Sequence, residues 1–401
     1  MKELKLLFSI FAIGLLTSSC SILKNIRLVK AGEVVQEAFY QVIDFEERKG
    51  YIIITAEIRG NEYRFVLDSG APNVISRSML SDLGLDIESS VPAFDSQGNR
   101  GKLDIVVLDT ICLGDLAFTN MSASVIETDS IIELYCLSVD GLIGANLMKH
   151  AIWEINYEEE KIIITDDPKK LDGHDSGLEV AFTTSVQGSP YIHIHHGDLR
   201  IKNVLVDLGS GGSLSIPHKS FKKIIQSENI KPLQGYGSSS YGIFGRCIDS
   251  SYSALSNQVH LGSMPMDSMM ISTTQYSKRH AILGTYSLKN YPFIIDWPGE
   301  KIIFKSDKAR PRELESYGFG FGLENNGLFV WFVYDDSPAG KAGIRVGTQI
   351  LSINGRDVSD LDVDDYCEIR NEKLESDILF LKVKEGENLR EVELRKEFLY
   401  K

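Results

Sequence analysis

The chain has few of the residues that staple small proteins or carry a protein across a membrane. Five cysteines among 401 residues are too few to form a disulfide framework. The longest apolar stretch, residues 6–16, would rise only about 16 Å as a helix, which is too short to span a bilayer. Basic residues are outnumbered 42 to 56, giving a net charge of −14. A surface this negative repels a phosphate backbone and argues against nucleic-acid binding.

The residues that are present are those of a soluble globular protein. The hydrophobic fraction of 43% is enough to build substantial cores. Glycine is frequent, with 34 residues, and aromatic and β-branched residues recur in short runs. This pattern favours strands joined by turns over helical bundles. The length of 401 residues predicts two or three domains.

The N-terminus has the pattern of an export signal. Two lysines precede the apolar residues 6–16, and three small residues then lead to Cys20. The arrangement resembles a bacterial lipobox, in which a diacylglyceryl group is attached to the cysteine thiol, and an ordinary secretory signal is the alternative. We expect residues 1–19 to be removed and residues 20–37 to link a lipid-anchored, exported lipoprotein to the membrane of the bacterial cell envelope.

The rest of the chain contains an internal duplication. Residues 144–167 align without gaps with residues 284–307, and eight of the 24 positions are identical. Upstream, residues 51–68 resemble residues 191–207, and each stretch shows two alternating strands ending in an aspartate. The period of about 140 residues is too long for a solenoid unit. The repeat therefore predicts two similar lobes, at 38–168 and 169–309.

Each lobe carries the same short motif at nearly the same spacing. Asp68-Ser69-Gly70 is followed 76 residues after the aspartate by an apolar-apolar-Gly motif ending at Gly144. In the second lobe, Asp207-Leu208-Gly209 is followed after 77 residues by the one ending at Gly284. A single Asp-Ser-Gly is an ordinary turn sequence. Its recurrence at matched distance indicates a functional pair.

These motifs resemble those of the aspartic peptidases, both the single-lobed retroviral type and the two-lobed pepsin type. The resemblance implies a mainly β protein with two tandem pepsin- or retropepsin-like β-barrel lobes. It also implies that Asp68 and Asp207 meet between the lobes as a catalytic pair. The residues expected to support this pair are Ser69, Gly70, Gly209, Ser210, Gly144 and Gly284.

Two carboxyl groups about 3 Å apart share one proton, because they cannot both ionise cheaply. The ionised group would then take a proton from a water that attacks a peptide carbonyl, without a metal or organic cofactor. One feature departs from the family pattern, since Leu208 lacks the hydroxyl that Ser69 offers for bracing the opposite lobe. The sequence therefore predicts an aspartic endopeptidase acting on peptides or proteins. The alternative is a peptide-binding scaffold with a degenerate protease fold.

The family also has a mobile hairpin, the flap, that covers bound peptide. In the first lobe the flap candidate contains Gly98. In the second lobe it is longer, spans residues 235–242, and includes Tyr236, Gly237 and Tyr241. The sequence thus predicts that the second lobe supplies the larger lid, and a plain surface loop is the alternative.

Residues 310–401 form a third unit. Ser337-Pro338-Ala339, the following Ala-Gly and the later Ile-Asn-Gly resemble a PDZ domain of the bacterial type, which implies a β fold with two short helices. Such a domain binds an extended peptide by strand addition and holds its C-terminal carboxylate. It would recruit substrates or gate the cleft. The predicted carboxylate loop comprises Gly318, Phe319, Gly320 and Phe321.

Two weaker patterns remain. His193 and His195 share one face of a strand at a spacing that suits zinc, although an exposed strand is the favoured interpretation. The cysteines after the anchor are interpreted as buried thiols, with a Cys112–Cys136 bridge as the alternative in an oxidising compartment; these four are Cys112, Cys136, Cys247 and Cys367. No serine, cysteine or histidine constellation indicates a competing hydrolase.

Overall fold

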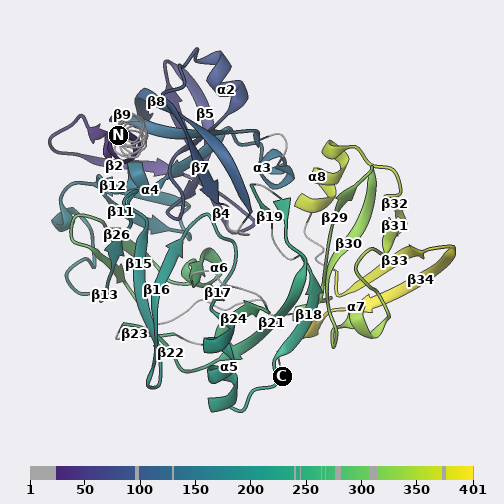
Figure 1. Cartoon of the computed structure of the whole chain (residues 1–401). Coiled ribbons are helices and arrows are strands. Elements are labelled where there is room, and N and C mark those ends of the chain that lie inside the picture. Colours follow the sequence, from purple (N-terminus) through teal and green to yellow (C-terminus); the bar gives the residue numbers. More distant parts are fainter. Residues whose placement is uncertain are drawn as a thin grey trace, which may run out of the picture.

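The computed structural model describes residues 24–94, 99–128, 131–238, 241–243, 245–262, 264–266, 268–275, 281–306, 315–372 and 376–400. The chain is mainly β, as its sequence predicts, and forms two lobes followed by a third module (Figure 1). Within the described residues, no helix is both long and apolar enough to cross a membrane. The export signal and Cys20 lie outside the described residues.

The first lobe is a closed barrel. Strands β9, β6, β10, β5, β4 and β8 pair in that order, and β8 then pairs back with β9. The buried side chains of β4 alternate, so that Ile52 and Ile54 enter the main core while Ile53 packs outside it. The elements are β1 (Glu33–Val34), β3 (Glu46–Arg48), β4 (Tyr51–Ile58), β5 (Asn61–Asp68), β6 (Val74–Ser76), β7 (Ser89–Phe94), β8 (Arg100–Leu113), β9 (Leu116–Ile126), β10 (Gly141–Gly144), α2 (Arg77–Asp82), α3 (Ile132–Leu137) and α4 (Ala145–Met148).

The second lobe repeats this strand order. β15, β16, β25, β17, β24, β21 and β18 follow one another across the sheet as β4, β5, β10, β6, β9, β8 and β7 do in the first lobe. The elements are β14 (Thr183–Thr184), β15 (Pro190–His196), β16 (Leu199–Asp207), β17 (Leu214–Ser215), β18 (Leu233–Gly237), β19 (Tyr241–Gly242), β20 (Gly245–Arg246), β21 (Asp249–Ser256), β22 (Val259–Leu261), β23 (Met264–Pro265), β24 (Met269–Thr274), β25 (Ile282–Gly284), α5 (His218–Ser227) and α6 (Thr285–Leu288).

The two lobes are joined by a shared six-stranded sheet with the order β13-β27-β26-β11-β12-β2. Its central pair, β11 and β26, comes from the duplicated segments, and the register Trp153↔Ile295 and Ile155↔Phe293 relates them by a two-fold axis. The side chains of these strands are almost completely buried. The elements are β2 (Tyr40–Asp44), β11 (Ile152–Asn156), β12 (Lys161–Thr165), the 3-10 turn η2 (Pro168–Lys170), β13 (Leu178–Ala181), β26 (Phe293–Asp296) and β27 (Lys301–Phe304).

The third module has the two short helices that the sequence predicts. Ser337 caps the first helix by accepting a hydrogen bond from Gly340 N at 3.1 Å. Asn354 and Gly355 both have positive φ, at 50° and 85°, which is the backbone of a tight hairpin turn. The elements are β28 (Glu315–Ser316), β29 (Phe319–Glu324), β30 (Gly327–Tyr334), α7 (Pro338–Lys341), β31 (Gln349–Ile353), β32 (Arg356–Asp357), α8 (Val363–Asn371), β33 (Ile378–Glu385), β34 (Asn388–Arg395) and β35 (Glu397–Phe398).

The third module shares a sheet with the second lobe. Strand β30 pairs antiparallel with β18, in the register Gly235↔Tyr334 and Gly237↔Phe332. The two glycines permit this approach, because a Cβ at Gly235 would lie 2.5 Å from Phe332 Cζ and one at Gly237 would lie 2.0 Å from Trp331 O. The third module is therefore joined to the second lobe by a continuous sheet.

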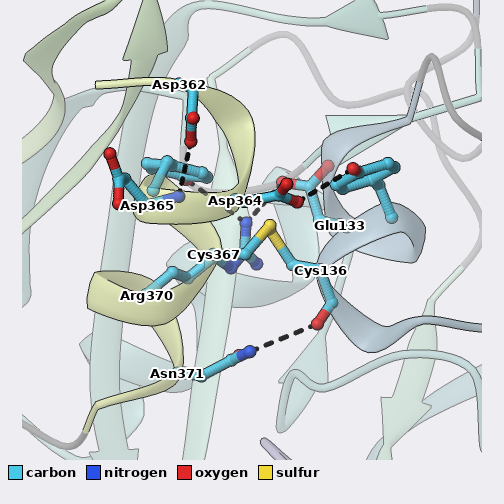
Figure 2. Close-up of a disulfide and its surroundings, with 10 residues drawn as sticks. Glu133, Cys136, Asp362, Asp364, Asp365, Cys367, Arg370 and Asn371 are labelled. Atoms are coloured by element: carbon cyan, nitrogen blue, oxygen red, sulfur yellow. Dashed lines mark hydrogen bonds and ion pairs between the residues drawn. A yellow bond between two sulfur atoms is a disulfide. The ribbon is translucent and has the colours of Figure 1, made fainter. Parts of the chain in front are cut away.

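The cysteine interpretation needs correction. Cys136 on α3 forms a disulfide with Cys367 on α8, 231 residues away, and not with Cys112 (Figure 2). Cys112 lies on β8 opposite Glu57 of β4, on the barrel wall, as a free and partly buried thiol. Cys247 is also free but exposed. Spacing in the sequence could not predict the bridge, because it depends on how the third module docks on the first lobe.

Candidate active site

Two loops bring Asp68 and Asp207 to the interface between the lobes. Each aspartate ends a strand that pairs in parallel with a shorter one, in the registers Gly144↔Asp68 and Gly284↔Asp207. These partner glycines are packed tightly, because a Cβ at Gly144 would lie 2.1 Å from Pro72 C and one at Gly284 would lie 2.4 Å from Gly212 O. The apolar-apolar-Gly motif thus packs against each aspartate loop and supports it.

The two aspartates face each other across the lobe interface. A Cβ at Gly70 would lie 2.7 Å from Asp207 Cγ, and a Cβ at Gly209 would lie 2.2 Å from Asp68 Oδ2. Each carboxyl group therefore lies against the glycine of the opposite loop, where any larger residue would displace it. The two carboxyl groups are thus close enough for each to shift the pKa of the other.

The environment of the two carboxyl groups is not symmetric. Asp68 Oδ1 accepts hydrogen bonds from Gly70 N at 2.7 Å and Ala71 N at 2.9 Å. Asp207 Oδ1 accepts one from Gly209 N at 2.9 Å, and the N–H of Ser210 gives it weaker support. Burial raises the pKa of Asp68, and these N–H groups partly offset the rise. Burial together with the charge of Asp68 holds the pKa of Asp207 well above its usual range. The two carboxyl groups therefore titrate as a coupled pair, and the larger rise at Asp207 favours the form in which Asp207 holds the shared proton.

The Ser69 hydroxyl braces the two loops against each other. Ser69 Oγ donates to Val206 O of the second lobe at 2.7 Å and accepts from Leu208 N at 3.0 Å. Leu208 itself is fully buried in the main apolar core. The second lobe gives other support to the first loop, because Gln187 Nε2 donates to Gly70 O at 3.1 Å. Apolar packing thus replaces the hydroxyl that the sequence lacks at position 208.

Polar groups that the sequence analysis did not single out fix the ends of the loops. Asn73 is buried and its Oδ1 accepts from Gly144 N at 2.7 Å, while its own N–H donates to Asn146 Oδ1 at 2.7 Å. In the second lobe, Ser210 O accepts from Thr285 N at 2.8 Å. Asn73 follows the Asp-Ser-Gly motif within five residues, but nothing in the sequence marks it as buried.

Two tyrosines that the sequence analysis also did not assign flank the aspartates. Tyr51 begins β4 and Tyr191 lies near the start of β15, at equivalent positions of the duplication. Both are partly buried. Burial raises the pKa of each phenol, and the charge of Asp207 raises it further in both cases. The repeat itself was the available signal, because a tyrosine opens both aligned segments.

The structure describes the flap candidates only in part. Gly98 lies outside the described residues, and Tyr241 begins β19. Tyr236 lies on β18 and its side chain is 51% exposed, whereas Gly237 is packed on the third module as described above. Just before β8, Asn99 Nδ2 donates to Gly245 O of the second-lobe hairpin at 3.4 Å. The second hairpin is therefore attached at both ends to neighbouring structure.

The predicted carboxylate loop lies at the start of β29. Gly318 has φ 79°, and its carbonyl accepts from Tyr334 N at 2.9 Å. Phe319, Gly320 and Phe321 follow as the first residues of the strand. Within the described residues, β29 pairs only with β30, so its other edge has no strand partner. That edge is the side on which an added peptide strand would pair.

His193 and His195 occupy alternate positions of β15. His195 lies opposite His260 of β22 in the strand register. In the part of the chain that the structure describes, no three His, Cys, Asp or Glu side chains are grouped closely enough to hold a metal ion.

Comparison with known proteins gives two domain assignments. Residues 54–147 match the family model described as aspartyl protease, and residues 333–374 match the model of a PDZ domain. The chain therefore carries an aspartyl protease-type domain in its first lobe and a PDZ domain in its third module. No curated protein matches the chain.

Several solved structures are similar in part. Basic 7S globulin from soybean is 10% identical, with a TM-score of 0.40 over 68% of this chain and 95% of the globulin. Conglutin gamma, a basic 7S globulin from lupine seeds, is 13% identical, with a TM-score of 0.39 over 67% and 95%. A retropepsin-like aspartic protease from Rickettsia conorii is 18% identical, with a TM-score of 0.23 over 34% and 93%.

Proposed function

We propose that the chain is an exported aspartic endopeptidase that uses the Asp68/Asp207 pair to hydrolyse peptide bonds. The observation that carries this proposal is the close approach of the two carboxyl groups, each against the glycine of the opposite loop. A structural aspartate at a turn does not need a second carboxyl group beside it. Two carboxyl groups held in contact cost folding free energy and shift each other's pKa, and pairs perturbed in this way cluster at functional sites.

The asymmetry of the pair assigns a role to each aspartate. Asp68, stabilised as a carboxylate by two N–H groups, would accept a proton from a water molecule held between the carboxyl groups. That water then attacks the peptide carbonyl carbon, while the proton of Asp207 forms a hydrogen bond to the developing oxyanion. As the tetrahedral intermediate collapses, Asp68 passes the proton that it took from water to the leaving amine, the C–N bond breaks, and Asp207 keeps its own proton.

The PDZ module would recruit the peptide or control its access to the cleft. The unpaired edge of β29 supports recruitment by strand addition. The pairing of β30 with β18 supports control of access, because β18 belongs to the second-lobe hairpin. Extended peptides with free C-termini are therefore the proposed partners.

A cleavage assay tests the enzymatic proposal. The purified chain should cut an unfolded protein, with activity highest where the pair holds one proton. Because the pKa of Asp207 lies well above the usual carboxyl range, the proton persists to higher pH and activity should decline only above that range. Activity should also fall at low pH, when Asp68 becomes protonated. A peptide carrying a hydroxyl isostere of the tetrahedral intermediate should inhibit.

Two outcomes of this assay would contradict parts of the proposal. If no substrate is cut between pH 3 and 8, the enzyme proposal fails, and the non-cleaving scaffold is favoured by the buried Leu208 in place of a bracing hydroxyl. If peptides with free and amidated C-termini are cut with equal KM, recruitment through the PDZ carboxylate loop is contradicted.

We also propose that the chain is a lipid-anchored protein of the bacterial cell envelope. The Cys136–Cys367 disulfide supports an oxidising compartment. Cells producing the chain should hold it in the membrane fraction, and a Cys20→Ala variant should be released to the soluble exported fraction. Equal partition of the two chains would contradict the anchor.

A further inference from the structure

Helix α8 of the PDZ module lies directly against helix α3 of the first lobe (Figure 2). The Cys136–Cys367 disulfide joins them covalently. Asn371 Nδ2 donates to Cys136 O at 3.2 Å, and Tyr135 OH donates to Asp364 Oδ1 at 2.9 Å. The position of α8 relative to the first lobe is therefore fixed along the whole length of the short α3.

This contact places Arg370 beside the first lobe. Arg370 lies one turn after Cys367, and its Nη1 donates to Glu133 Oε1 of α3 at 3.1 Å. The guanidinium side chain is 26% exposed, so it can still reach a ligand in solvent. Glu133 can satisfy only part of its five-donor fork. An arginine held in this way is preorganised to bind a carboxylate.

Helix α3 also packs on the first-lobe barrel, close to the start of β4. Its Leu137 packs with Ile53 and Val66 on the outer face of the barrel, and Tyr51 packs against the same cluster. The Tyr51 hydroxyl would lie 3.9 Å from a Cβ at Gly211, in the loop that carries Asp207. The charges of both aspartates and of Arg370 all act on this phenol. Tyr51 thus lies between the loop that carries Asp207 and helix α3, on which the PDZ module docks.

A second cation lies on the same side. Lys49, two residues before Tyr51, is exposed, yet the surrounding protein atoms and the charge of Arg370 lower the pKa of its ammonium group to about 8. Lys49 and Arg370 repel each other, and Glu133 neutralises only one of them. The excess positive charge contrasts with the net charge of −14 of the whole chain. A bound carboxylate would relieve this repulsion.

The carbonyl oxygen of Lys49 would lie 3.7 Å from a Cβ at Gly211, in the loop that carries Asp207. We propose that Arg370 of the PDZ module and Lys49 of the first lobe form a cationic subsite beside this loop, which selects peptides carrying a carboxylate on that side of the scissile bond. The proposal rests on the proposed function and specifies the substrate class of that site. The PDZ module would then have two roles. It would bind a peptide along β29, and it would also supply a residue that determines the specificity of the aspartate site.

A set of paired peptides tests the subsite. Amidated peptides carry either Glu or Gln at successive positions around one cleavable bond, and kcat/KM is measured for each pair. The wild-type chain should prefer Glu at one position by about 10-fold or more, the size expected for a charge-assisted hydrogen bond. Peptides that end at that position with a free or an amidated C-terminus distinguish a terminal carboxylate from a side chain.

Three variants assign the preference to named residues. Arg370→Gln should remove the Glu/Gln preference, Arg370→Lys should restore part of it, and Lys49→Gln should reduce it. Arg356→Gln is the matched control, because Arg356 is an exposed arginine of the same module that pairs with Glu368 and Glu372 of α8. An unchanged preference in Arg370→Gln, or no preference for Glu at any position in the wild type, would overturn the proposal.

Binding separates this proposal from the proposed function. Fluorescence anisotropy measures the affinity of the same peptides for the Asp68→Asn chain, in which no cleavage is expected. A preference for Glu that depends on Arg370 in binding, with no cleavage by the wild type, would refute the endopeptidase and leave the subsite standing. Cleavage without any such preference would do the reverse.

Discussion

Asparagine at position 68 is expected to lower kcat by about 10²- to 10⁴-fold, because it removes the carboxylate assigned to accept a proton from water. The amide cannot act as a base, and the N–H groups of Gly70 and Ala71 would lose the charge that they stabilise. Asparagine at position 207 should have a similar effect, since it lacks the acidic proton that Asp207 offers to the developing oxyanion. Initial rates on one peptide substrate measure both losses.

The free energy of unfolding distinguishes a loss of catalysis from a loss of folding in these variants. The raised pKa of Asp207 means that the folded state binds its proton more tightly than the unfolded state. The wild type therefore loses stability as pH rises through that pKa, whereas the Asp207→Asn chain has no proton to lose. The free energy of unfolding of the variant should equal or exceed that of the wild type at pH 7. Chemical denaturation at pH 4 and 7 measures the difference.

Asp109→Asn is the matched control for both variants. Asp109 is an exposed aspartate of the first lobe that pairs with Arg59 at 2.8 Å. Its replacement should leave both the rate and the stability nearly unchanged. Full activity in either dyad variant would refute the assignment of Asp68 and Asp207 to the chemistry.

Loss of the Cys136–Cys367 disulfide is expected to lower the free energy of unfolding by about 2–5 kcal/mol. The bridge closes a chain segment with a sequence separation of 231 residues, which is a large constraint on the unfolded chain. We expect a Cys136→Ser/Cys367→Ser chain to show this loss in thermal and denaturant unfolding. Reduced wild type should behave like the variant.

The destabilisation caused by loss of the disulfide should be confined to the two helices that it joins. Hydrogen exchange should increase in α3 and α8, where the bridge and its neighbouring hydrogen bonds hold the two helices together. The strands β18 and β30 should stay protected, since their pairing does not depend on sulfur. Cys247→Ser, at an exposed free thiol, is the control and should unfold like the wild type. Equal stability of oxidised and reduced wild type would contradict this account.

Much of this architecture can be predicted because the two lobes arise from an internal duplication that is visible in the sequence. Two aspartates at matched distances from two glycines are enough to predict two lobes and a site between them. The same alignment contains Tyr51 and Tyr191, but a tyrosine at a strand start is too common to be assigned a role without its neighbours. The burial of Leu208 could be expected because leucine is apolar. The hydrogen bond from Gln187 to Gly70 O could not be expected from the sequence.

The docking of the PDZ module could not be predicted from local patterns. Gly235 and Gly237 lie in a stretch typical of a flexible lid, and only the structure shows that they admit a strand from a segment about 100 residues later. In the same way, cysteine spacing allowed a bridge within the first lobe, while the actual partner of Cys136 is on another module. Contacts between distant segments depend on surfaces that exist only after each part has folded.

The shared sheet has a consequence for the order in which the protein can be completed. Until residues 327–334 have been added, β18 presents unpaired backbone groups along one edge of the second lobe. An open edge of this kind is a template for association with other chains. The lobes that carry the aspartates thus emerge first but remain exposed to aggregation until the C-terminal module has paired with them. A truncated chain that ends after the second lobe would keep that open edge for its whole lifetime.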